Sequence, residues 1–292
     1  MSDAIPSIAP VTQLEAGRIA RRFAALAERS ELGLVAYLTA GDPTLEASEK
    51  IILAAAEAGS DVIELGMPFS DPVADGPTIQ RASERALRSG TTLAGVLSLA
   101  RRIREKVDTP LVLFSYYNPV LQMGLERLAT EAAAAGVDGV LITDLTPEEA
   151  DDYRAAMHTR GLDTIFLAAP TSTDERLTRI AAATTGFLYL ISRTGVTGTR
   201  DALPEDLPSL VRRARAATRL PIAVGFGISL PTHVSVLGGI ADAAVVGSAL
   251  VAQVEKAATP EAAATRVGDL IRTLKRAARV GISRRGIDRG SG

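Results

Sequence analysis

Short apolar runs alternate with amphipathic runs along most of this chain. Eight runs are apolar at nearly every position, which is typical of strands buried on both faces of a parallel sheet. They occupy residues 34–39, 61–65, 111–116, 139–143, 164–168, 186–191, 221–225 and 243–246. Segments with apolar residues at helical spacing separate them, at residues 44–58, 78–86 with 92–106, 122–135, 147–160, 173–183, 205–218, 230–238 and 260–280.

Eight strand–helix alternations in 292 residues predict an α/β protein with a single (β/α)8 TIM barrel. A doubly wound open sheet is the alternative fold. The glycine fingerprint of a dinucleotide-binding sheet is missing, because Gly225-Phe-Gly227 continues as Ile-Ser-Leu without a third glycine.

The chain before the first strand predicts one additional helix. Within residues 15–29, Ile19, Phe23 and Leu26 recur at helical spacing, and their apolar face could close the bottom of the barrel. We expect residues 1–14 to form a flexible N-terminus and residues 15–280 to form the catalytic barrel domain. Residues 281–292 are rich in arginine and glycine, so we expect a disordered basic tail.

One stretch, Val62-Ile-Glu-Leu-Gly-Met-Pro-Phe-Ser-Asp-Pro-Val-Ala-Asp-Gly-Pro77, combines a strand with three carboxylates. Glu64 lies inside the apolar strand, where a carboxylate is unfavourable unless it is paired or used. Asp71 and Asp75 follow in a loop that prolines and glycines keep irregular. This arrangement favours acid/base chemistry at a barrel mouth. The alternative is a buried glutamate bonded to backbone amides, with aspartates that cap turns.

The ends of the last two strands are typical of a phosphate site. Gly227 follows the seventh strand, and Gly247 and Ser248 follow the eighth. In barrels of this class, the loops after these strands present backbone N–H groups to an anion. Ordinary tight turns are the alternative interpretation of the same glycines.

Polar side chains also follow other strands. Tyr37 lies near the end of the first strand, and Tyr116 ends the third. The loop from Arg193 to Gly198 carries Thr197 and has the composition of a mobile lid, or else of a plain surface loop. Arg193 would contact the phosphate or anchor the lid, and the sequence leaves both roles open.

Composition excludes several kinds of chemistry. The chain has no cysteine, two histidines and four lysines, and no lysine lies on a predicted strand or directly after one. Thiol catalysis, a zinc site built from clustered histidines and a strand-borne Schiff-base lysine are therefore not expected, nor is any metal site. Carboxylate acid/base catalysis remains.

Charge and hydropathy limit the possible partners and the cellular location of the protein. The net charge of −2 gives no reason to expect a nucleic acid or a membrane as partner. Neither a secretory signal nor a run of 18 apolar residues is present, and we expect a cytoplasmic protein.

Across residues 17–277 the chain resembles the tryptophan synthase α subunit family. Besides the stretch from Val62 to Pro77, the matching blocks are Tyr37-Leu-Thr-Ala-Gly-Asp-Pro43, Tyr116-Tyr-Asn118, Gly136-Val-Asp-Gly139 with Asp144, Ser192-Arg-Thr-Gly-Val-Thr-Gly198, Gly225-Phe-Gly227 and Gly247-Ser248. They occur in the family's order.

The resemblance implies retro-aldol cleavage of indole-3-glycerol phosphate to indole and D-glyceraldehyde 3-phosphate in tryptophan biosynthesis. Glu64 matches the general acid/base, and Asp75 matches the carboxylate that binds the indole N–H. Thr197 matches a lid residue that contacts Asp75, and Tyr189 matches a tyrosine beside the catalytic glutamate. The matching phosphate-binding positions are Gly198, Phe226, Gly227, Gly247 and Ser248.

The resemblance also implies a partner. The family works with a β subunit in an α2β2 heterotetramer, and pyridoxal phosphate belongs to that β subunit, so no cofactor is expected in this chain. Two other hypotheses compete with the lyase. One is another phosphate-binding TIM-barrel enzyme, and the other is a non-catalytic activator of a β subunit.

Overall fold

The structure, a computed structural model, describes residues 17–191, 203–225 and 227–283. Within those residues, parallel strands form one sheet in the order β5-β4-β3-β2-β1-β9-β8-β7-β6. The strands are β1 (Gly33–Thr39), β2 (Val62–Gly66), β3 (Leu111–Ser115), β4 (Gly139–Ile142), β5 (Asp163–Ile165), β6 (Leu167–Ala168), β7 (Leu188–Ile191), β8 (Ile222–Gly225) and β9 (Ala243–Val246).

The two ends of this order, β5 and β6, belong to one stretch of chain that is interrupted at Phe166. Strand β5 pairs with β4, whereas β6 pairs with β7. The Phe166 carbonyl also accepts a hydrogen bond from the Tyr189 N–H at 3.3 Å. The sheet therefore closes on itself, and the (β/α)8 barrel predicted from the sequence is confirmed.

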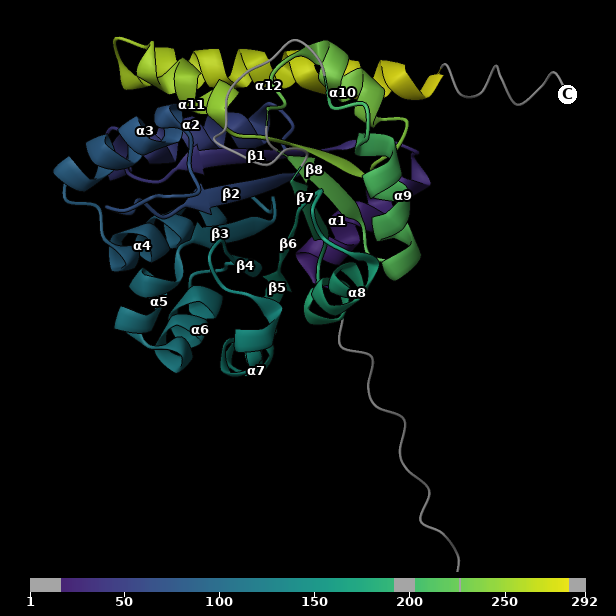
Figure 1. The fold of residues 1–292 in the computed structure, drawn as a ribbon. Coiled ribbons are helices and arrows are strands. Elements are labelled where there is room, and N and C mark those ends of the chain that lie inside the picture. Colours follow the sequence, from purple (N-terminus) through teal and green to yellow (C-terminus); the bar gives the residue numbers. More distant parts are fainter. Residues whose placement is uncertain (1–16, 192–202, 226, 284–292) are drawn as a thin grey trace, which may run out of the picture.

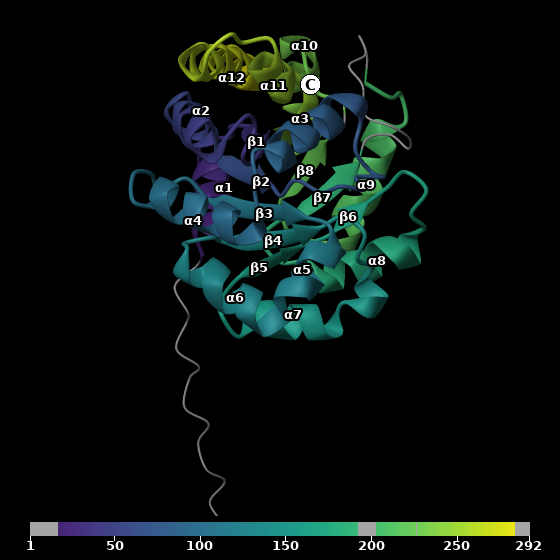
Figure 2. The same cartoon turned by 90° about the vertical axis from the view of Figure 1, so that its left-hand side faces the viewer.

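Helices surround the strands (Figures 1 and 2). They are α1 (Arg18–Glu28), α2 (Leu45–Glu57), α3 (Pro77–Arg88), α4 (Leu93–Arg104), α5 (Tyr117–Met123), α6 (Leu125–Ala134), the 3-10 helix η1 (Pro147–Glu149), α7 (Asp151–His158), α8 (Asp174–Ala183), α9 (Leu207–Ala217), α10 (Pro231–Leu237), α11 (Ser248–Glu255) and α12 (Pro260–Ser283). Helix α12 packs against α2, α10 and α11.

Local sequence explains where several of these helices begin. Thr44 precedes α2, and its hydroxyl accepts the Ala47 N–H at 3.2 Å. Thr92 precedes α4 and accepts the Gly95 N–H in the same way. Each threonine satisfies an amide that the first helical turn leaves without a partner.

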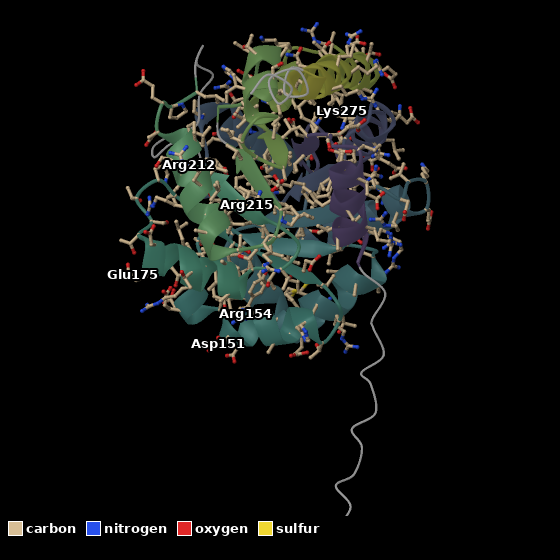
Figure 3. All side chains as sticks on the ribbon, turned by 90° about the vertical axis from the view of Figure 1, so that its right-hand side faces the viewer. Asp151, Arg154, Glu175, Arg212, Arg215 and Lys275 are labelled. Carbon is tan, nitrogen blue, oxygen red and sulfur yellow. The ribbon has the colours of Figure 1, made fainter. Side chains whose placement is uncertain are left out.

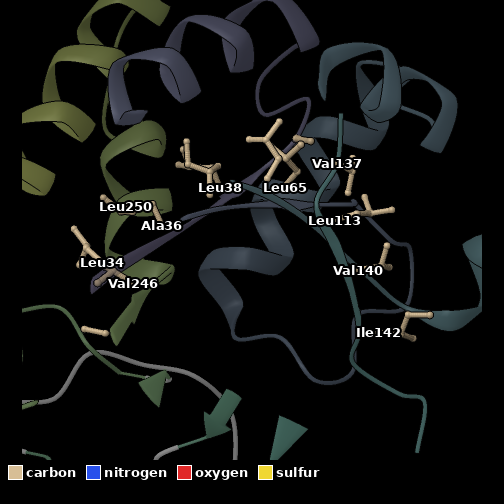
Figure 4. Packing of buried hydrophobic residues seen from close by; sticks show 14 of the residues in the cluster. Leu34, Ala36, Leu38, Leu65, Leu113, Val137, Val140, Ile142, Val246 and Leu250 are labelled. Carbon is tan, nitrogen blue, oxygen red and sulfur yellow. The ribbon is translucent and has the colours of Figure 1, made fainter. Parts of the chain in front are cut away.

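The strands alternate between two apolar layers. On β1, Leu34, Ala36 and Leu38 point outward and pack beneath the helices (Figure 4). Val35 and Tyr37 belong instead to the cluster inside the barrel. Because successive side chains of a strand point to opposite faces, strands that are apolar throughout build both layers at once.

Helix α1 closes one end of the barrel interior. Its buried residues Ile19, Phe23 and Leu26 join the cluster that the inward-facing strand residues form. The Phe23 ring lies 5.6 Å from the ring of Phe187, measured between centroids. The additional helix and its predicted closure of the barrel are thus confirmed.

Several element boundaries differ from the prediction. The strand expected at residues 164–168 is divided at Phe166, and the helix expected at 122–135 is divided at Gly124, whose φ of +89° breaks the helical path. Helix α11 was not predicted, because its short apolar run follows β9 without a separating turn. Helix α12 continues past residue 280 to Ser283. Residues 1–14 and 284–292 lie outside the described residues.

Aspartates join neighbouring strands at the end of the barrel opposite the mouth. The carboxylate of Asp61 accepts the Leu34 N–H at 2.7 Å, and the carboxylate of Asp138 accepts the Leu111 N–H at 2.8 Å. Asp242 does the same for β8. Each of the three carboxylates also forms a salt bridge with a lysine or an arginine. These bonds satisfy backbone donors where the ladders begin.

Charged side chains cover the outer helices (Figure 3). Asp151 and Arg154 lie on α7 and form a salt bridge at 3.6 Å, while Arg212 and Arg215 lie on α9. No helix within the described ranges is long and apolar enough to span a membrane.

Candidate active site

Glu64 lies in the middle of β2 and points into the barrel. Its neighbours Ile63 and Leu65 belong to the outer layer, so the alternation of the strand turns Glu64 inward. The side chain is 0% exposed, and neither carboxylate oxygen has a hydrogen-bond partner among the described residues. Burial raises the pKa of Glu64 from 4.5 to about 8. Glu64 therefore holds a proton at neutral pH and can donate it.

Asp75 reaches the same region from the loop after β2. The loop turns back where the Asp75 N–H donates to the Pro72 carbonyl at 3.0 Å. The Tyr116 hydroxyl then donates to the Asp75 carboxylate at 3.2 Å and accepts the Ala74 N–H at 3.0 Å. Phe69 stacks on Tyr116 with the ring centroids 5.1 Å apart. Tyr116 thus holds the loop and its carboxylate together.

The surroundings of Asp75 act on its pKa in opposite directions. Burial raises the pKa from 3.8 to about 6, and the hydrogen bond from Tyr116 acts to lower it. Asp75 is therefore mostly ionised at neutral pH, when Glu64 is mostly protonated. Two carboxyl groups whose pKa values are separated in this way suit the roles of a proton donor and an anion.

Tyr37 and Tyr189 share the interior with these two carboxyl groups. Burial raises the pKa of both tyrosines well above the ordinary value, and the charges of Asp75 and Glu64 raise it further. Tyr37 is also paired in register with Glu64 across β1 and β2. The structure therefore brings together four residues that the sequence placed on three different strands and a loop.

Two glycines leave space for the tyrosine hydroxyls. A Cβ atom on Gly66 would lie 2.3 Å from the Tyr37 hydroxyl, and one on Gly225 would lie 2.3 Å from the Tyr189 hydroxyl. Real Cβ atoms essentially never approach an oxygen so closely, so a larger residue at either position would have to displace the tyrosine ring. The same contact explains why glycine ends both β2 and β8.

A candidate anion pocket lies at the exits of the paired strands β8 and β9. Gly227 has a φ of +86°, a conformation that favours glycine. Gly247 precedes α11, and no side chain caps this helix, which begins at Ser248. Backbone amides at an uncapped helix start attract an anion. A Cβ atom on Gly247 would lie 3.4 Å from the Tyr37 side chain. The candidate anion pocket therefore adjoins the interior that Tyr37 shares with the two carboxyl groups.

Other residues of the prediction lie elsewhere or outside the described residues. Asp71 is exposed and does not join buried Glu64 and half-buried Asp75. Arg193, Thr197, Gly198 and Phe226 fall among the residues that the structure does not describe, so their roles stay predictions. Within the described ranges, no group of three or more histidine, aspartate or glutamate residues could hold a metal ion.

The sequence did not single out the contacts that position Asp75. Phe69 and the Ala74 amide both act through Tyr116, and they were interpreted only as parts of an irregular loop. The one available signal was an aromatic residue within a stretch of prolines and small residues. Long-range pairing between a loop and the end of β3 leaves no periodic trace in a sequence.

Comparison with known proteins gives a consistent result. The family profile described as tryptophan synthase alpha chain matches residues 23–279. A tryptophan synthase alpha chain of Solibacter usitatus is 55% identical over 259 residues, which cover 89% of this chain and 97% of that protein. A Mycobacterium tuberculosis tryptophan synthase structure superposes with a TM-score of 0.84 at 37% identity, covering 91% of this chain and 99% of the other.

A second solved structure comes from a complex. A chain of the tryptophan synthase complex of Pyrococcus furiosus superposes with a TM-score of 0.78 at 40% identity. The match covers 84% of the present chain and 98% of the archaeal one.

Proposed function

The chain belongs to the tryptophan synthase alpha chain family, and on that basis we propose that Glu64 and Asp75 cleave indole-3-glycerol phosphate into indole and D-glyceraldehyde 3-phosphate. The reaction is a carbon–carbon lyase step of tryptophan biosynthesis. The observation that carries the residue assignment is the wholly buried Glu64 carboxyl group, which has no hydrogen-bond partner in the described residues. A buried acid without a partner is unfavourable for folding, which favours a functional role.

The proposed steps leave Glu64 protonated again at the end of the reaction. Glu64 donates its proton to the indole ring carbon that bears the side chain, and the ring becomes cationic at its nitrogen. The Asp75 anion accepts a hydrogen bond from the ring N–H group and stabilises this positive charge. The Glu64 carboxylate then removes the proton of the hydroxyl group next to the ring. The C–C bond breaks, its electron pair restores neutral indole, and the hydroxyl carbon becomes the aldehyde.

Indole release from indole-3-glycerol phosphate tests the assignment of Glu64. Glu64→Gln keeps the size of the side chain but removes the transferable proton, so we expect kcat to fall by about 100-fold or more. Glu57→Gln, at an exposed position of α2, is the matched control and should keep wild-type turnover. Turnover of Glu64→Gln within about threefold of wild type would refute the assignment.

The substrate phosphate is proposed to bind the amides around Gly227, Gly247 and Ser248. The resemblance adds Gly198 and Phe226 to this set, and Arg193 and Thr197 to the lid above it. The uncapped start of α11 supports the proposal, because it presents partial positive charge without a competing side chain. Ser248→Ala should raise KM for indole-3-glycerol phosphate and weaken binding of inorganic phosphate in parallel. An unchanged affinity for inorganic phosphate would contradict this placement.

We propose a tryptophan synthase β subunit as the partner, in an α2β2 heterotetramer in the cytoplasm, with pyridoxal phosphate carried by the β subunit. Large apolar side chains are exposed on two segments that leave the mouth, Val73 at 84% and Leu121 at 51%. Exposed apolar residues next to a functional site favour an interface. Sedimentation of the mixed subunits should give a heterotetramer, and Val73→Asp should weaken it. Two separate sedimenting species would contradict the proposal.

The same mixture distinguishes the lyase from a non-catalytic activator. An activator would raise β-subunit turnover from indole and serine without releasing indole from indole-3-glycerol phosphate. Release of indole by the chain, alone or with the β subunit, supports the lyase.

A further inference from the structure

Four charged residues join three segments around the barrel mouth, and we call them the clasp: Asp42, Arg81, Arg85 and Glu255. Arg85 donates from Nε and Nη2 to the two Asp42 oxygens, each at 2.8 Å. Arg81 donates from Nε and Nη2 to Glu255, at 2.6 and 2.9 Å. Arg85 Nη1 also donates to Glu255 at 3.2 Å. Two bidentate pairs with a shared member fix orientation as well as distance.

The clasp is not an ordinary pair of surface charges. The Asp42 side chain is 3% exposed, so its pairing with Arg85 is buried on one side. The hydrogen bonds from Arg81, together with the charge of Arg85, lower the pKa of Glu255 from 4.5 to about 2. Glu255 therefore stays ionised across the physiological range and keeps its pairing with the two arginines.

Each of the three segments leads directly to a part of the candidate site. Helix α3 begins immediately after Asp75, and Gln80 in its first turns donates to the Asp75 carbonyl at 2.9 Å. Helix α11 begins at Ser248, at the candidate anion pocket. Asp42 follows β1, which carries Tyr37. Helices α3 and α11 are in contact with each other.

The clasp residues stand away from the reacting atoms. Arg85 lies nine positions after Gly76, and a helical rise of 1.5 Å per residue puts it roughly 13 Å along α3 from the Asp75 loop. Glu255 lies at the far end of α11 from Ser248. These side chains can therefore act only through the two helices that they join.

We propose that the clasp is a positioning device that holds the Asp75 loop at a fixed distance and angle from the anion pocket. This inference rests on the proposed function, because one substrate must reach both places with its ring and its phosphate. A helix is rigid along its axis. Joining α3 to α11 therefore fixes the distance between the Asp75 loop, which precedes α3, and the anion pocket at the start of α11. A misplacement of about 1 Å between such ends can lower a rate by about 100-fold.

The test removes the outer half of the clasp, where folding tolerates change. Glu255→Ala removes all three α3–α11 hydrogen bonds of the clasp, and Arg81→Met removes two of them. Both variants leave the buried Asp42–Arg85 pair intact. The control is Arg88→Met on the same helix, because Arg88 pairs with exposed Glu84 within α3 and not with α11. Arg81→Lys serves as the conservative rescue.

The measurement separates positioning from general stability. We expect Arg81→Met and Glu255→Ala to lower kcat/KM for indole-3-glycerol phosphate about tenfold, with partial recovery in Arg81→Lys and none of this loss in Arg88→Met. Binding of inorganic phosphate alone should stay within twofold of wild type, since each end of the site remains intact. An equal loss in Arg88→Met, or wild-type kcat/KM in both clasp variants, would overturn the proposal.

A second measurement does not depend on turnover. A carbon-13 NMR titration follows the Asp75 carboxyl group, whose charge acts on Tyr116, Tyr37 and Tyr189. Its pKa should move from about 6 toward 3.8 in Glu255→Ala as the loosened loop admits water. The pKa should not move in Arg88→Met. An unmoved pKa in Glu255→Ala would overturn the clasp's role even if the wild-type chain cleaves no substrate, whereas failure of cleavage alone would overturn only the proposed function.

Discussion

The burial of Glu64 predicts a pH-dependent cost to stability that the variant Glu64→Gln removes. The pKa of Glu64 rises from 4.5 to about 8 in the folded chain, a shift of about 3.5 units. At about 1.36 kcal/mol per unit, the folded state loses up to ~5 kcal/mol relative to a side chain that does not titrate.

The sign of this pH dependence follows from which state, folded or unfolded, binds the proton at each pH. Below pH 4.5 both the folded and the unfolded chain hold the proton, so Glu64 has no effect on the pH dependence. Between pH 4.5 and 8 the unfolded chain releases the proton while the folded chain retains it, so stability falls as pH rises. Above pH 8 both states are ionised and the loss is constant. From pH 5 to pH 8 the expected change is about 3–4 kcal/mol.

Urea unfolding at pH 5, 6, 7 and 8, followed by circular dichroism, measures this change. The free energy of unfolding of Glu64→Gln minus that of wild type should increase by about 3–4 kcal/mol over the range. Glu57→Gln supplies the control at an exposed position, and its difference from wild type should stay flat. A difference for Glu64→Gln that varies by less than about 1 kcal/mol would refute the reasoning, because the carboxyl group would then titrate as if solvated.

Three further predictions concern the chamber around the two carboxyl groups. The pH profile of kcat/KM for indole-3-glycerol phosphate should be bell-shaped, with limbs near 6 from Asp75 and near 8 from Glu64; a flat profile in steady-state assays from pH 5 to 9 would contradict this. Tyr116→Phe removes a hydrogen bond to the Asp75 anion, so the acid limb should move to higher pH in the same assay, and a limb that stays or moves lower would refute that role. Gly66→Ala places a Cβ against Tyr37 and should lower the free energy of unfolding by about 1–3 kcal/mol in urea titrations, whereas unchanged stability would show that the ring moves aside.

Particular elements show how far the sequence predicts the fold. The strand that holds Glu64 is apolar on both faces, and this pattern follows from burial under helices on one side and inside the barrel on the other. The helix that closes the barrel was also predictable, since its apolar stripe has helical spacing. Boundaries were less accurate at Gly124, where a positive φ divides a helix, and at Phe166, where the strand changes its pairing partner from β4 to β7.

The chemistry of this protein was largely determined by residue type and order along the chain. Absent cysteine, scarce histidine and a glutamate within an apolar strand left carboxylates as the acid/base groups. The tertiary structure alone decided that Glu64 has no hydrogen-bond partner among the residues described, that Tyr116 holds Asp75, and that the clasp spans α3 and α11. The physical reason is that alternation and helical spacing are local properties, whereas desolvation and paired charges arise only when distant segments are packed against one another.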